Sequence, residues 1–273
     1  MPLETGSGTP AQADPLRVEP AARIVGRLAE ERARAPLGAP CLLAFDADGT
    51  LWDGDVGFDL FEALTATRGA REDALDALER EAEEFEVHAP GDANDVATAL
   101  FAAYGEHRYP EPRAFAMMAW AFAGYRQDEL HEFVAQVLRR NNLEARVHAE
   151  LAPILAWATA EGVETMVVSA SPRAVVVAGV ALLGIPPERV LAMTPAIEDG
   201  RIAPRLAGPI VYAEGKLDVL RAARPSAALL GAFGDTVYDG PMLRAARVPV
   251  AVHAKTSLVE IAATIPGLVA LGA

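Results

Sequence analysis

The chain has 273 residues, of which 52% are hydrophobic and 23% charged, a composition typical of a soluble globular protein with one large domain or two smaller ones. Its formal net charge of -14 argues against a nucleic acid partner, because such a field repels a phosphate backbone. The two longest apolar runs, residues 114–125 and 174–185, are shorter than the roughly 20 residues of a membrane-spanning helix, so no membrane association is expected.

The N-terminal residues carry no basic segment followed by an apolar one, and they are not expected to be a secretory signal. Residues 1–19 are instead expected to form a disordered tail. Cys41 is the only cysteine, so no disulfide can form within the chain. Cysteine usage of this kind favours a reducing compartment, and we expect a cytoplasmic location.

Helical spacing and short apolar runs alternate along much of the chain. Residues 20–35 have the periodicity of an amphipathic helix, and the proline-rich segment 36–40 ends it. Buried strands are predicted at residues 41–45, 164–168, 190–193, 227–233 and 248–252. Helices are predicted between the later strands at residues 172–183, 214–223 and 241–246. This alternation predicts an α/β core with a doubly wound, Rossmann-like parallel sheet.

A long segment without strand pattern separates the first two predicted strands. It is expected to contain helices near residues 58–67, 72–85, 93–104, 113–125, 129–139 and 149–160. Because a structureless loop of this length would be unusual, we predict an all-helical cap domain at 56–146, inserted into a core made of 20–55 and 147–273. A short hairpin is also predicted at 196–203, where Asp199 and Gly200 suit a tight turn.

Two aspartates, Asp46 and Asp48, directly follow the first predicted strand. In an extended chain, residues two apart point to the same side. Carboxylates placed so close together repel each other unless a cation, a shared proton or water separates them. The stretch therefore indicates a metal site, a proton-sharing pair or an exposed turn.

Other polar residues follow the later strands, at the edge where ligands bind in doubly wound sheets. Ser169 follows the second strand, Asp235 follows the fourth with Asp239 four residues further on, and Lys216 begins the helix before that fourth strand. Lys216 and Lys255 are the only two lysines, so each stands out as a possible point charge. Each residue alone would be an ordinary cap or turn residue, but their joint appearance at successive strand ends indicates a catalytic site.

This ordered set resembles the haloacid dehalogenase superfamily. The segment DADGT at residues 46–50 is similar to its first motif, Ser169 to its second, Lys216 to its third, and Gly234-Asp235 with Asp239 to its fourth. The resemblance covers roughly residues 41–52 and 160–252. The position of the helical insert, and the stretch EDGRIAPRLAGPIVYAEGK before the lysine, are similar to the phosphoserine phosphatase-like subgroup.

The resemblance implies a phosphomonoesterase that acts on a small phosphate ester. Asp46 would attack phosphorus and become an aspartyl phosphate. Asp48 would act as general acid to the leaving group and then as general base for water. Mg²⁺ would be held by the carboxylates of Asp46 and Asp235, and the resemblance adds the backbone carbonyl of Asp48.

The remaining residues of the set would support this chemistry. Ser169 and nearby backbone N–H groups such as that of Ala170 would hold phosphate oxygens, while Lys216 offsets negative charge. Asp239 would hold a metal-bound water or Lys216. A dehalogenase would need neither Asp48 as acid nor a metal, a phosphomutase would share the core, and a noncatalytic phospho-ligand-binding protein would be expected to lack one of these groups.

The substrate is suggested by the segment WDGDVGFDLF, which follows the first motif. Asp55 stands nine residues after Asp46, where phosphoserine phosphatases have a glutamate that approaches the substrate ammonium; the alternative is a solvated turn residue. Phosphoserine would also need a cation for its carboxylate, whereas phosphocholine or phosphoethanolamine would not. Most aromatic residues of the insert, among them Tyr104, Tyr109, Trp120 and Tyr125, are expected in its core, and a minority could form a wall for a cation. The sequence leaves the oligomeric state open.

Overall fold

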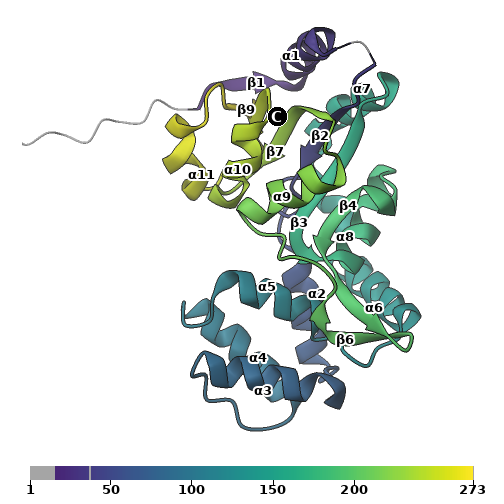
Figure 1. Ribbon diagram of the computed structural model, residues 1–273, viewed down its shortest axis with the longest axis vertical. Helices are drawn as coiled ribbons and strands as arrows, with labels where there is room; N and C mark the ends of the chain where they lie inside the picture. Colours follow the sequence, from purple (N-terminus) through teal and green to yellow (C-terminus); the bar gives the residue numbers. More distant parts are fainter. Residues whose placement is uncertain (1–15, 37, 273) are drawn as a thin grey trace, which may run out of the picture.

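The computed structural model describes residues 16–36 and 38–272, which form a seven-stranded parallel sheet and a separate two-stranded hairpin. The strand order across the large sheet is β1-β9-β8-β7-β2-β3-β4. The strands are β1 (Val18–Pro20), β2 (Cys41–Phe45), β3 (Glu164–Pro172), β4 (Val190–Met193), β7 (Ala228–Gly234), β8 (Val248–Ala251) and β9 (Val269–Gly272). With helices flanking the sheet (Figure 1), the predicted α/β fold is confirmed.

The strand order brings three of the predicted polar strand ends together. β2 lies between β7 and β3, with Phe45 opposite both Phe233 and Val167 in register. The chain builds β2, β3 and β4 outward in one direction and then returns to the other side of β2 with β7. Strand order therefore reverses at β2, which is where doubly wound sheets bind ligands. The Phe45 and Phe233 rings stack at 4.2 Å beneath this edge.

The sequence does not predict two strands of the sheet, β1 and β9. β1 pairs in parallel with β9 at the edge of the sheet, so residues 18 and 19, expected in a disordered tail, form regular structure. β1 has three residues, includes a proline and exposes 65% of Val18, and a segment of that kind gives no alternating apolar signal. Residues 1–15 lie outside the described residues, and disorder there stays a prediction.

Helices cover the sheet and continue into the insert. Around the sheet are α1 (Ala21–Arg34), α7 (Ala152–Ala160), α8 (Arg173–Val180), α9 (Glu214–Ala223), α10 (Gly240–Ala245) and α11 (Thr256–Ile261). The short 3-10 helices are η1 (Glu72–Ala74), η2 (Leu143–Arg146), η3 (Ala149–Leu151), η4 (Ala181–Leu183), η5 (Pro187–Arg189), η6 (Val237–Asp239) and η7 (Ala262–Thr264). No described helix is both long and apolar enough to cross a membrane.

The regular elements described between residues 56 and 146 are helices, as the sequence predicts. They are α2 (Val56–Ala66), α3 (Leu75–Glu84), α4 (Ala93–Gly105), α5 (Glu111–Trp120) and α6 (Gln127–Arg140). Figure 1 shows α3, α4 and α5 at the end of the molecule opposite α1 and β1. The hairpin of β5 (Pro195–Glu198) and β6 (Arg201–Leu206) joins them, because Ile202 exchanges backbone hydrogen bonds of 2.9 and 2.8 Å with Gly124 and Tyr125.

The two chain crossings between the sheet and the helical insert lie side by side. Trp52 and Val147 form an antiparallel bridge. Asp53 N donates to Arg146 O at 2.9 Å, and His148 N donates to Leu51 O at 3.0 Å. Any movement of the insert relative to the sheet would therefore pass through this paired hinge.

Candidate active site

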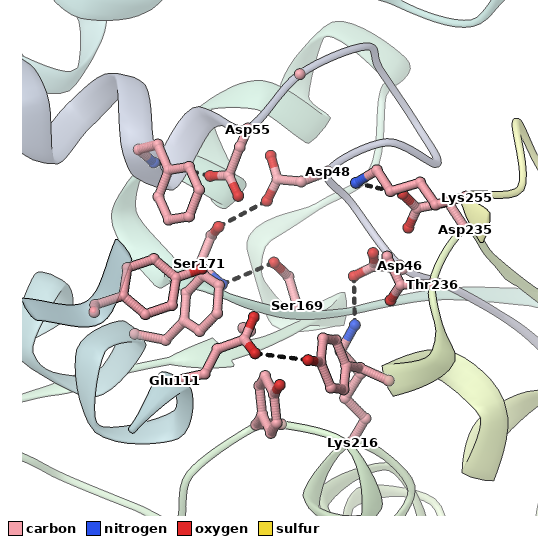
Figure 2. A pocket seen from close by; sticks show the side chains of 17 residues that line it. Asp46, Asp48, Asp55, Glu111, Ser169, Ser171, Lys216, Asp235, Thr236 and Lys255 are labelled. Atoms are coloured by element: carbon pink, nitrogen blue, oxygen red, sulfur yellow. Dashed lines mark hydrogen bonds and ion pairs between the residues drawn. The ribbon is translucent and has the colours of Figure 1, made fainter. Parts of the chain in front are cut away.

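A cavity of about 290 Å³ lies where β2, β3 and β7 end, between the sheet and the helical insert. Its lining includes Asp46, Asp48, Ser169, Ala170, Lys216, Asp235 and Asp55, all of which are sequence-predicted site residues. Figure 2 shows Asp46, Lys216, Asp235 and Lys255 on one side of this space, with Asp55 on another. Asp239, the remaining predicted residue, lies directly behind Lys216.

Lys216 is held between two carboxylates. Its Nζ donates hydrogen bonds of 2.7 Å to Asp46 Oδ1 and 2.7 Å to Asp239 Oδ1, and only 3% of Lys216 is exposed. Burial alone would lower the pKa of Lys216, but Asp239 and Asp46 raise it above its ordinary value, so the side chain stays cationic. The charge of Lys216 is therefore fixed beside Asp46.

Asp239 uses both carboxylate oxygens within the protein. Oδ1 accepts from Lys216, while Oδ2 accepts from the backbone N of Asp235 and of Thr236, each at 3.0 Å. The sequence predicts that Asp239 holds either a metal-bound water or Lys216, and the structure shows the contact with Lys216. Asp239 thus links the lysine to the turn that carries Asp235.

Asp235 has the environment of a cation ligand. It is 0% exposed, and neither of its carboxylate oxygens accepts a hydrogen bond of acceptable geometry from the described residues. The nearby charge is Lys255 Nζ, which forms an ion pair with Oδ2 at 2.8 Å. Burial raises the pKa of Asp235, Asp239 adds to the rise, and Lys255 opposes it. A buried carboxylate with so few partners is costly unless a cation accompanies it.

The surrounding residues fit a divalent metal ion. One carboxylate oxygen each from Asp46, Asp235 and Asp239 lies within 4.8 Å of the other two. Burial raises the pKa of Asp46 well above its ordinary value; Lys216 opposes the rise, and Asp239 and Asp235 add to it. Gly49 has φ +78°, and a Cβ there would clash with the Asp235 carboxylate. Carboxylate oxygens of this kind suit a hard cation, and those of Asp46 and Asp235 could bind one.

Asp48 is oriented by three donors. Its Oδ1 accepts from Trp52 Nε1 at 2.8 Å and from Val56 N at 2.7 Å, and its Oδ2 accepts from Ser171 Oγ at 2.7 Å. Trp52 and Val56 belong to the hinge and to the first turn of α2, so the position of Asp48 depends on the insert. Ser169 Oγ accepts from Ser171 N at 3.0 Å, which leaves its hydroxyl hydrogen available to a ligand in the cavity.

Five aromatic rings line the cavity. Phe58, Tyr104 and Phe115 come from α2, α4 and α5, whereas Tyr212 comes from a loop of the core and Tyr238 from η6. Their centroids lie 5.7 Å (Phe58 to Phe115), 6.2 Å (Tyr104 to Phe115), 5.9 Å (Phe115 to Tyr212) and 4.6 Å (Tyr212 to Tyr238) apart. We call these five residues the aromatic wall. Burial raises the pKa of Tyr104 to about 12, so this phenol is neutral at physiological pH.

Two carboxylates border the aromatic wall. Glu111 Oε2 accepts a hydrogen bond of 2.7 Å from Tyr238. Asp55 Oδ1 accepts from Phe58 N at 2.8 Å and so caps α2. Burial, followed by the charge of Asp48, raises the pKa of Asp55 well above its ordinary value. Asp55, for which the solvated turn residue was the alternative to a substrate contact, is therefore a helix cap that also lines the cavity.

Several lining residues were not assigned to the site from sequence. They include Ser171, Lys255, Glu111, Tyr212 and Tyr238. Ser171 had a detectable signal, since it lies two residues after Ser169 at the end of the same strand. Lys255 could have been noticed because it is one of only two lysines in the chain. Of the four aromatic residues singled out in the insert, Tyr104 lines the cavity, while Tyr109 and Trp120 are buried at 1% and 5% exposure and Tyr125 packs against the core.

The fold and the site together define a doubly wound α/β protein with carboxylates and a buried lysine at the ends of parallel strands. The family model of haloacid dehalogenase-like hydrolases matches residues 43–244. The chain therefore belongs to the haloacid dehalogenase-like hydrolase family. No curated protein matches the chain.

Solved structures with a similar fold include proteins without an assigned function. A protein of unknown function from Bordetella pertussis Tohama I is 22% identical, with a TM-score of 0.67 and coverage of 86% of this chain and 99% of that one. A functionally unknown protein from Anaerococcus prevotii is 14% identical, with a TM-score of 0.66 and coverage of 92% and 91%. A probable phosphoserine phosphatase from Vibrio cholerae is 17% identical, with a TM-score of 0.55 and coverage of 84% and 60%.

Proposed function

We propose that the protein is a magnesium-dependent phosphomonoesterase that hydrolyses a small phosphate ester through an aspartyl-phosphate intermediate. The observation that carries the proposal is the Asp46 carboxylate, which faces the cavity beside the buried cation Lys216 and the poorly partnered Asp235. The similarity in fold to a probable phosphoserine phosphatase supports the same chemistry.

Each step uses an atom of this chain. A carboxylate oxygen of Asp46 attacks phosphorus as the bond to the leaving oxygen breaks, and Asp48 gives that oxygen a proton. Asp48 then takes a proton from the water that cleaves the aspartyl phosphate and frees Asp46. Lys216 and Ser169 stabilise the charge on the phosphoryl oxygens. Mg²⁺, held by Asp46, Asp235 and the Asp48 carbonyl, would supply further positive charge at the phosphoryl group.

The cavity supports an ester whose other end is a cation. Lys216 offers positive charge for a phosphate, whereas the aromatic wall, Asp55 and Glu111 offer apolar surface and negative charge. Aromatic faces bordered by carboxylates attract ammonium groups, and quaternary ammonium groups are often bound in this way. The described lining contains no arginine that could bind the carboxylate of phosphoserine. We therefore favour phosphocholine or phosphoethanolamine over phosphoserine.

A substrate panel tests this proposal. Phosphate release from phosphocholine, phosphoethanolamine, phosphoserine and glycerol phosphate is measured with the purified chain, with and without Mg²⁺. We expect Mg²⁺-dependent release and the highest kcat/KM for the first two esters. A folded protein that releases phosphate from none of a broad range of monoesters would overturn the phosphatase assignment. A preference for glycerol phosphate would overturn only the proposal that the substrate carries a cationic group.

A further inference from the structure

Two histidines and a glutamate meet beside the hinge, outside the lining of the active-site cavity. His148 lies on the segment that returns from the helical insert, Glu150 follows two residues later, and His253 lies in the loop after β8. One possible ligand atom from each lies within 4.8 Å of the other two. The two imidazole rings are 4.2 Å apart between centroids.

The tautomer of His148 is set by a backbone contact. Its Nδ1 lies 2.9 Å from Thr50 O, and because a carbonyl oxygen only accepts, Nδ1 must carry the proton. In the neutral ring, Nε2 then presents a free lone pair. Histidines that bind metals typically donate their other ring N–H to a carbonyl or carboxylate, which fixes both tautomer and orientation.

The other two groups are held near this lone pair. His253 Nε2 lies 2.5 Å from Glu150 Oε1, with 55% of the histidine side chain and 19% of the glutamate side chain exposed. His253 has φ +44°, a left-handed conformation that few residues with a Cβ adopt. Hydrogen bonds from Val252 N to Gly234 O and from Lys255 N to Asp235 O, at 3.0 and 2.8 Å, hold the loop in this shape.

We propose that His148, Glu150 and His253 form a second metal site, which binds a transition metal ion such as Zn²⁺. Two imidazoles and one carboxylate suit zinc, whereas magnesium prefers a site built of oxygen atoms. The site is therefore chemically distinct from the one at Asp46 and Asp235. A bound ion would tie the returning hinge segment to the loop that carries Lys255.

Calorimetric titration with Zn²⁺ in excess Mg²⁺ tests the site on the full chain. We expect the native protein to bind one equivalent and the His148→Ala and His253→Ala variants to lose more affinity than the roughly 10- to 100-fold that loss of a supporting hydrogen bond costs. His131→Ala, which removes an exposed histidine on α6, should bind as the native protein does. Asp235→Asn should also retain the Zn²⁺ isotherm.

A second readout separates this site from a simple ion pair between Glu150 and His253. Hydrogen exchange with and without Zn²⁺ should show protection of residues 146–150 and 252–255, but not of the β5–β6 hairpin. Because His253 is exposed, His253→Ala should fold even if His148→Ala does not. Unchanged Zn²⁺ binding in His253→Ala, or loss of binding in Asp235→Asn, would overturn the proposal.

Discussion

Ser171 donates a 2.7 Å hydrogen bond to Asp48, across an interval of 123 residues in the chain. The same carboxylate accepts from Trp52 and Val56 at the start of the insert. Asp48 is therefore held jointly by β3 and by the hinge. This arrangement couples the proposed general acid to the position of the helical insert.

Loss of the proposed general acid should depend on the leaving group. We expect Asp48→Asn to lower kcat about 10²- to 10⁴-fold for alkyl phosphates, because a poor leaving group needs the proton. The loss should be much smaller for p-nitrophenyl phosphate, which leaves without one. Ser171→Ala should show the same leaving-group pattern with a smaller loss, and Ser171→Thr should restore activity. Equal losses on both esters would contradict the role of Asp48.

Loss of the proposed nucleophile should not depend on the leaving group. Asp46→Asn should lower turnover at least about 10³-fold on every ester, because the covalent route is removed. Mass spectrometry of acid-quenched native enzyme should detect a phosphorylated peptide that contains residue 46. Near-normal turnover by a folded Asp46→Asn variant would exclude the mechanism.

Chelation should abolish activity, and added Mg²⁺ should restore it. Asp235→Ala should raise the Mg²⁺ concentration for half-maximal activity, since it removes a proposed ligand. Lys255→Ala should lower that concentration about 2- to 5-fold, the size of a partly exposed ion pair, because Lys255 Nζ lies 2.8 Å from Asp235 Oδ2 and competes with the ion. Lys255→Arg, which keeps the charge, is the matched control. Full activity after exhaustive chelation would favour dehalogenase-like chemistry.

Residues at strand ends were predictable because their signal is local. Asp46, Ser169 and Asp235 each follow an apolar run directly, and parallel strands bring such ends to one edge. The aromatic wall was not predictable, because it joins three helices of the insert to a loop and a short 3-10 helix of the core, and no local pattern encodes that packing. Lys255 also reaches the site through a loop, from one strand further across the sheet.

The ends of helices are likewise only partly predictable from the local sequence. Periodicity predicts a helix at 113–125, whereas α5 is Glu111–Trp120. The helix begins earlier because Pro112 lies in its first turn, where a missing N–H costs nothing. It ends earlier because Gly124 has φ +85° and its backbone N bonds to Ile202 O in the hairpin, at 2.9 Å. A contact between segments so far apart in the chain overrides the apolar pattern.

The ion pair between Glu164 and Arg224 should make stability depend on pH. Two hydrogen bonds of 2.7 Å join the side chains, and Arg224 lowers the pKa of Glu164. A depressed folded-state pKa adds stability above the unfolded value of about 4.3, and this is lost as pH falls through the folded value. Arg224→Ala should thus cost about 0.2–1 kcal/mol at pH 7 and almost nothing near pH 2, by urea unfolding. A cost independent of pH would show that packing, not charge, is responsible.

The aromatic wall and its two carboxylates make the last prediction, which concerns substrate charge. Asp55→Asn keeps a good helix cap and Glu111→Gln keeps an acceptor for Tyr238, so each variant removes charge with little other change. We expect each to lower kcat/KM for phosphocholine about 10- to 100-fold, the value of a hydrogen bond or contact to a charged group. Glycerol phosphate has no cation to lose a partner, so its kcat/KM should change by less than about 3-fold by the same reasoning. An equal loss on both esters would indicate a structural role, and no loss on either would rule out ammonium recognition.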